Sequence, residues 1–169
     1  MRRIGLILVV ALGCSRAKPA ATPHGYAAFK IGQALEVPPG WQCEKDRQHQ
    51  KCSTADSVIL VRLTEERISS IEVLQAPLLN VAGDGCAVFE SVEAELIKSN
   101  GSPTDRKNNG CPKPQDPTPG RGACTRWVSG GHQLVVGLDR NLEDSGLRGF
   151  FLQVAEVRVR EAKCAPESE

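Results

Sequence analysis

Residues 57–74, SVILVRLTEERISSIEVL, decide the fold class of this chain. Two runs rich in β-branched residues, 57–63 and 68–74, are separated by only four residues. Such short runs, placed so close together, are typical of two antiparallel strands joined by a tight connection. Glu65 and Glu66 lie in the connection, where we expect both carboxylates to be solvated. The stretch therefore predicts a sheet that is mainly antiparallel.

Residues 84–100, DGCAVFESVEAELIKSN, predict the main helix. Asp84 is a suitable N-cap, Gly101 provides a left-handed stop, and Pro103 blocks continuation. Apolar side chains recur at helical spacing, which predicts one face packed on the sheet. These side chains are Phe89, Val92, Leu96 and Ile97, whereas Glu90, Glu93, Glu95 and Lys98 fall mainly elsewhere.

Residues 124–139 predict a second hairpin, because Gly130-Gly131 separates two alternating runs. Residues 150–160, FFLQVAEVRVR, predict the last strand. Its apolar phase shifts between Val154 and Val157, which indicates either a bulge or a strand covered on both faces. Together these elements predict an α+β domain in which one main helix covers a mainly antiparallel sheet.

The chain begins with MRRIGLILVVALGC, residues 1–14, which has the plan of an export signal. Arg2 and Arg3 precede an apolar run that is too short to span a bilayer, which takes about 20 residues. Ala11-Leu12-Gly13-Cys14 resembles a bacterial lipobox, which implies cleavage before Cys14 and lipidation of its thiol.

This resemblance implies a domain plan. Residues 1–13 are a lipoprotein signal peptide, 14–28 a lipidated flexible tether, 29–164 the folded domain, and 165–169 a polar tail. Ser15 after Cys14 is similar to the outer-membrane sorting signal of many Gram-negative lipoproteins. We therefore expect a cell-envelope protein, anchored to the outer membrane by lipid and facing the periplasm or the cell surface.

Seven cysteines support this plan. If Cys14 carries lipid, six remain, and an oxidising compartment allows them to form three disulfides. Each half of the chain has a cysteine before a loop and another after it. This plan favours Cys43–Cys52 and Cys111–Cys124, leaving Cys86–Cys164, among the 15 pairings that six cysteines allow.

A helix over 84–100, the turn Gly101-Ser102-Pro103 and the antiparallel strands up to 160 resemble the unit of the SmpA/BamE lipoproteins. In tandem, such units resemble the β-lactamase inhibitory protein architecture. The two halves of the chain share a plan of cysteine, strand, turn and strand, and this plan predicts a tandem repeat.

Charge and motifs exclude several classes of function. The net charge of +1 becomes −1 once Arg2 and Arg3 are removed, because 19 basic residues then face 20 acidic ones, so we expect no nucleic-acid partner. GxSxG, HExxH and CxxC motifs are absent, so we expect no catalytic residue, no metal and no cofactor. His24, His49 and His132 are expected to be solvated.

Residues 104–123, rich in proline and glycine, are the candidate binding loop. The candidate contact residues in this loop are Arg106, Lys107, Lys113 and Arg121. The sequence therefore predicts a non-enzymatic, membrane-anchored envelope lipoprotein that binds or assembles with an envelope protein. The alternative is a secreted or anchored protein inhibitor of an enzyme such as a β-lactamase or a protease.

Overall fold

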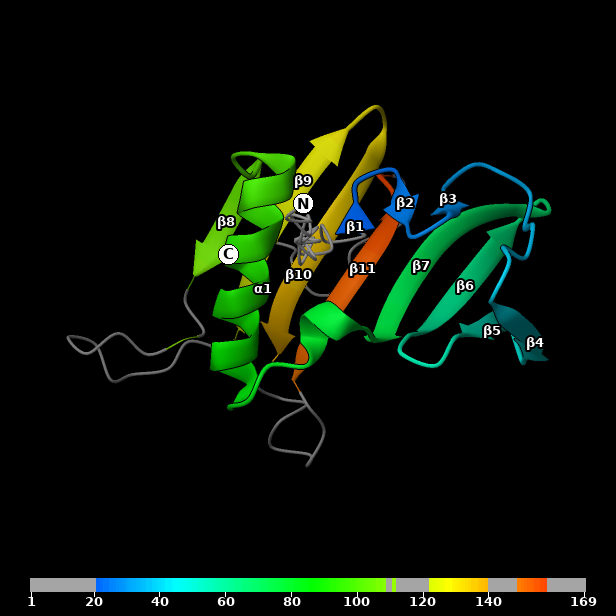
Figure 1. Ribbon diagram of the computed structural model, residues 1–169. Helices are drawn as coiled ribbons and strands as arrows, with labels where there is room; N and C mark the ends of the chain where they lie inside the picture. Colours follow the sequence, from blue (N-terminus) through cyan, green and yellow to red (C-terminus); the bar gives the residue numbers. More distant parts are fainter. Residues whose placement is uncertain (1–20, 109–110, 112–121, 140–148, 158–169) are drawn as a thin grey trace, which may run out of the picture.

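The computed structural model of the chain describes residues 21–108, 111, 122–139 and 149–157 (Figure 1). Its centre is an eight-stranded antiparallel sheet with the strand order β4-β5-β6-β7-β11-β10-β9-β8, accompanied by a three-stranded sheet, β1-β2-β3. The predicted α+β class with a mainly antiparallel sheet is confirmed. The strands are β1 (Ala21–Thr22), β2 (Gly25–Tyr26), β3 (Phe29–Lys30), β4 (Gln42–Asp46), β5 (His49–Ser53), β6 (Val58–Thr64), β7 (Arg67–Gln75), β8 (Asp105–Asn108), β9 (Gly122–Ser129), β10 (His132–Asp139) and β11 (Phe150–Glu156); the helices are the 3-10 helix η1 (Pro77–Leu79) and α1 (Gly85–Asn100).

The large sheet consists of two meanders joined by their last strands. β4 to β7 follow one another in the first meander, β8 to β11 in the second, and β7 pairs with β11. β11 is therefore central and is covered on both faces, because Val154 and Ala155 are both buried although they point to opposite sides. β10 pairs with β11 residue for residue over Phe150–Glu156, so the bulge alternative is wrong there, and residues 158–160 lie outside the described part.

Both predicted hairpins are present with two-residue turns. Glu65 and Glu66 have φ values of 51° and 63°, and Gly130 and Gly131 have φ values of 57° and 80°. Two successive positive φ values match the right-handed twist of the strands they join. The side chains of Glu65 and Glu66 are exposed, as expected.

A row of register partners crosses the sheet on its inner face. Val61 pairs with Ile71, Ile71 with Val154, Val154 with Leu134, and Leu134 with Trp127. All five side chains are at most 3% exposed. Because cross-strand partners lie on the same face, this row forms the floor of one continuous core.

Helix α1 covers the β8–β10 end of this floor (Figure 1). The Asp84 carboxylate accepts a hydrogen bond from the Ala87 amide at 2.9 Å, and the helix ends at Gly101, whose φ is 79°. The predicted cap and stop are therefore confirmed. Phe89, Val92 and Leu96 are buried, whereas Ile97 is half-buried.

The N-terminal segment covers the other end, on the same side of the sheet as α1 (Figure 1). Ala21 and Tyr26 are at most 2% exposed, and the Phe29 ring meets the Trp41 ring edge-on at a centroid distance of 4.9 Å. The expected tether over 14–28 is therefore too long, because 21–28 belong to the folded part. Burial of apolar and aromatic side chains against the core outweighs the small, polar composition that suggested a tether.

The disulfides confirm one predicted pair and correct the other two. Cys43 and Cys52 are register partners and are bonded, with their Cα atoms 4.1 Å apart. Cys111 is bonded to Cys86 at a Cα separation of 5.5 Å, so the predicted Cys111–Cys124 and Cys86–Cys164 bonds are wrong. Thr125 faces α1, and strand alternation turns Cys124 to the opposite side of the sheet, away from Cys86 in the first turn of α1. Cys124 is also disulfide-bonded, and Cys164 lies outside the described residues.

Candidate functional site

The predicted binding-loop residues do not gather into one site. Arg106 and Lys107 lie in the edge strand β8, and Arg106 is committed to an ion pair with Glu93 of α1. The Lys107 side chain is exposed, and Lys113 and Arg121 lie outside the described residues. Arg106 therefore stabilises the fold, whereas Lys107 is the described candidate whose side chain is exposed.

Glu93 is a buried carboxylate that sequence reasoning missed. Arg106 donates two hydrogen bonds to it, from Nε at 2.8 Å and from Nη2 at 2.6 Å, and the Thr125 hydroxyl donates a third. The Glu93 side chain is 4% exposed and that of Arg106 is 50% exposed. The burial of Glu93 could have been predicted from a helical projection, because Glu93 lies one turn from both Phe89 and Leu96, within the apolar stripe.

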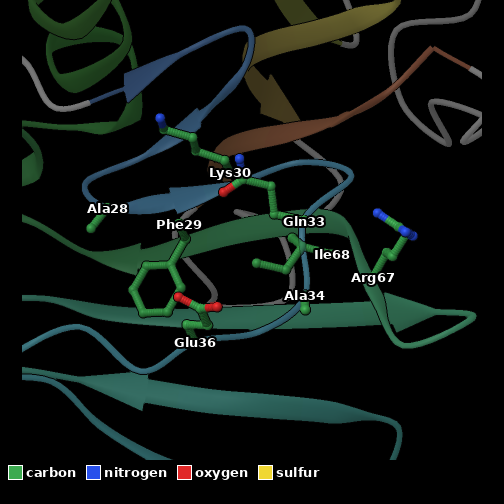
Figure 2. Close-up of a pocket in the computed structure, with 8 residues that line it drawn as sticks. All are labelled: Ala28, Phe29, Lys30, Gln33, Ala34, Glu36, Arg67 and Ile68. Atoms are coloured by element: carbon green, nitrogen blue, oxygen red, sulfur yellow. The ribbon is translucent and has the colours of Figure 1, made fainter.

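A recess of about 360 Å³ lies between the segment after β3 and strand β7 (Figure 2). Figure 2 shows the Lys30 and Arg67 side chains pointing away from one another, and Arg67 donates a hydrogen bond to the Gly32 carbonyl at 2.9 Å. The two cations therefore do not converge on a common anion. The recess is lined by Ala28, Phe29, Lys30, Gln33, Ala34, Glu36, Arg67 and Ile68.

The three histidines are not simply solvated. Arg62 donates a hydrogen bond to Nε2 of His49 at 3.3 Å, across the β5–β6 pair. His24, expected in the tether, lies in the turn between β1 and β2, and its Nδ1 is 3.1 Å from Nδ1 of His132 at the start of β10. No local pattern reveals this contact, because the two residues are 108 positions apart.

The polar groups with catalytic potential have structural partners. The buried carboxylate of Glu93 contacts Arg106 and Thr125 rather than a histidine. Burial raises the pKa of the Tyr26 phenol above its ordinary value of 10.0, and a hydrogen bond with Ser57 lowers it in part. This arrangement keeps Tyr26 protonated and favours a role in packing.

Metal and membrane features of the described part are limited. Within residues 21–108, 111, 122–139 and 149–157, His, Cys, Asp and Glu side chains do not cluster in threes around a common point. Over the same residues, each helix is too short or too polar to cross a membrane. Cys14, the predicted lipidation site, lies outside the described residues. No protein-family model, curated protein or solved structure matches this chain.

Proposed function

We propose that this chain is an exported lipoprotein of the cell envelope, anchored through lipid on Cys14, whose folded domain binds or assembles with an envelope protein. The observation that carries the proposal is the use of its cysteines. Cys14 is the cysteine of the lipobox-like stretch Ala11-Leu12-Gly13-Cys14. Five of the other six are disulfide-bonded: Cys43, Cys52, Cys86, Cys111 and Cys124.

This pattern supports export. Disulfides form and persist in oxidising compartments, such as the bacterial periplasm, and are rare in the cytosol. A chain with seven cysteines has an odd one, and lipidation of Cys14 accounts for it. The export signal and the disulfides are independent features, and both indicate an oxidising compartment outside the cytosol.

The described contacts favour binding over catalysis. The bonded cysteines are unavailable as nucleophiles, and the buried carboxylate of Glu93 is held by Arg106 and Thr125. A disulfide-linked, rigid domain is suited to recognition, because rigid surfaces lose less conformational entropy on binding. We therefore assign no cofactor to the proposed function and expect the partner to be an envelope protein.

The test is the mass of protein purified from the envelope, intact and then after proteolysis without reduction. We expect a chain that begins at Cys14 and carries diacylglycerol and fatty acid. The digest should contain three disulfide-linked peptide pairs, including Cys43–Cys52 and Cys86–Cys111, and none of them should contain Cys14. Cys14→Ser is the matched control, and it should carry neither diacylglycerol nor fatty acid but contain the same three pairs.

A soluble wild-type protein that is cut elsewhere, with Cys14 free or disulfide-bonded, would contradict the anchor. The binding role is tested separately, by cross-linking in intact cells before detergent extraction. Repeated failure to cross-link the anchored wild-type protein to an envelope protein, under conditions that capture a known envelope complex, would contradict that part.

A protein inhibitor of a secreted enzyme is the second candidate. The observation that favours it is that Cys111 and Cys124, which flank residues 112–121, are both disulfide-bonded. A segment held at both ends by covalent bonds loses less entropy on binding an enzyme. Assays of a β-lactamase and protease panel with micromolar protein test this candidate, and an absence of inhibition throughout the panel would remove it.

We also propose that the two halves of the domain are a tandem repeat. The symmetric strand order, in which each half forms a four-stranded meander, supports this proposal. Each meander is also preceded in the chain by a segment that contributes to the common core, 21–41 before β4 to β7 and α1 before β8 to β11.

A further inference from the structure

His24 and His132 form a pair of imidazoles at the surface. His24 belongs to the turn between β1 and β2, and His132 is the first residue of β10. Their Nδ1 atoms are 3.1 Å apart, and their ring centroids are 5.2 Å apart at an interplanar angle of 69°. His24 is exposed and His132 is half-buried, so water reaches the pair.

The His24 ring rests on the hairpin turn between β9 and β10. A Cβ atom at Gly130 would lie 2.9 Å from Cε1 of His24, so the glycine leaves the space that the ring occupies. Nε2 of His24 is 3.2 Å from the Ser129 hydroxyl oxygen, and the His24 carbonyl accepts a hydrogen bond from the Ile31 amide at 3.0 Å. Both the ring and the backbone of His24 are therefore held in place.

We propose that His24 and His132 chelate one divalent transition-metal ion, such as Zn²⁺, Ni²⁺ or Cu²⁺, through their Nδ1 atoms. Imidazole nitrogens suit these ions and bind them at about 2.0–2.1 Å. Two nitrogens at that distance from one ion are about 2.9 Å apart at a right angle and about 3.4 Å apart at the tetrahedral angle. The observed 3.1 Å lies between these values, so one ion can reach both nitrogens once the rings turn until both Nδ1 lone pairs converge on it.

Ser129 contacts the ring nitrogen of His24 that does not bind the metal in this proposal. In the tautomer with its proton on Nε2, His24 donates to the Ser129 hydroxyl and keeps the Nδ1 lone pair directed toward His132. A histidine that binds a metal commonly donates its other N–H in this way, which fixes both the tautomer and the ring orientation. Glu156, on the neighbouring strand β11, is the register partner of His132.

Water completes the coordination in this proposal, so the site is an open one. A bound ion joins the β1–β2 turn to the β9–β10 turn, and thus ties the N-terminal segment to the large sheet. Because this arrangement exists only in the folded chain, metal binding also stabilises the fold.

The experiment uses the full chain, purified without a polyhistidine tag and titrated separately with Zn²⁺, Ni²⁺ and Cu²⁺. We expect one ion per chain, and electron paramagnetic resonance of the Cu²⁺ form should show two nitrogen ligands. At about 100 times the dissociation constant, the melting temperature should rise by about 5–10 °C. His24→Ala and His132→Ala should each abolish this site, and Ser129→Ala should weaken binding about tenfold.

His49→Ala is the matched control, because His49 contacts Arg62 on a different hairpin, and it should bind metal like the wild type. His24→Gln and His132→Gln guard against misfolding, since they replace the ring with another polar side chain. Each variant is compared with the wild type by circular dichroism and disulfide mapping before metal is added. The proposal is overturned if folded wild-type protein binds none of the three ions at 100 µM, or if folded His24→Gln and His132→Gln bind them as the wild type does.

Discussion

The two halves of the large sheet are covered by different kinds of structure. Over β8 to β10 the cover is α1, a continuous helix of 16 residues with a capped start and a glycine at its end. Over β11 and β7 the cover is the segment 21–41, which has three strands of two residues each and buries Tyr26 and Phe29. Both covers nevertheless contribute side chains to the same hydrophobic core.

The difference shows how each cover depends on the sheet. The backbone hydrogen bonds of α1 are internal, so its conformation is a local property. The segment 21–41 instead shares hydrogen bonds with β7, from Gly32 N to Ile68 O at 2.7 Å and from Ile68 N to Gln33 O at 2.8 Å. Its conformation therefore requires that β7 is already in place.

The strongest test of this comparison is the substitution Phe29→Ala. Phe29 is 2% exposed and packs on Trp41, so its loss should lower the free energy of unfolding by about 3–5 kcal/mol. Leu74→Ala is the control, because Leu74 is 50% exposed, and it should change the free energy of unfolding by less than about 1 kcal/mol. Chemical denaturation with intact disulfides measures both values. A loss below 1 kcal/mol for Phe29→Ala would show that the N-terminal segment is not part of the core.

A smaller effect is expected at the ion pairs of the helix-covered half. Arg106 pairs with buried Glu93 on the inner face, whereas Arg126 of β9 pairs with Asp105 of β8 on the outer face. Arg106→Ala leaves a buried carboxylate without its charge partner and should cost about 2 kcal/mol, allowing for the half-exposed arginine. Arg126→Ala removes a solvated pair and should cost less than about 1 kcal/mol.

Denaturation curves of the two arginine variants give the comparison directly. Equal losses in the free energy of unfolding would contradict the prediction. They would mean that water reaches the ion pair on the inner face as well as it reaches the pair on the outer face. Glu93→Gln provides a further control, because it keeps the size of the side chain but removes the charge.

The smallest effect is a pH dependence at Tyr26. Because burial raises its pKa, the folded state holds the phenol proton more tightly than the unfolded state. This contribution to stability is complete below pH 10.0 and is lost as the pH rises through the folded-state pKa. The chain has one tyrosine, so phenolate absorbance reports this group alone, and it should appear at higher pH in folded than in urea-unfolded protein.

Ser57→Ala sharpens the tyrosine prediction. The hydrogen bond with Ser57 lowers the pKa of Tyr26, so its removal should move the phenolate transition to still higher pH. Identical transitions in folded and unfolded wild-type protein would place Tyr26 in water and would restore the longer tether.

Features that depend on neighbouring residues can be predicted from the sequence alone. Alternation predicted both hairpins, the helical period together with Asp84 and Gly101 predicted α1, and the position of Cys43 before a loop and Cys52 after it predicted their bond. These features follow from backbone geometry and turn chemistry within about 20 residues, and such patterns are legible in the chain.

Features that join distant segments are visible only in the three-dimensional structure. It paired β7 with β11, bonded Cys86 to Cys111, buried Glu93 beside Arg106 and brought His24 to His132. It also placed residues 21–28 in the folded part, with Ala21 and Tyr26 in the core. The physical reason is that these contacts depend on which faces meet after the strands assemble, and the side-chain pattern of each segment leaves the partner open.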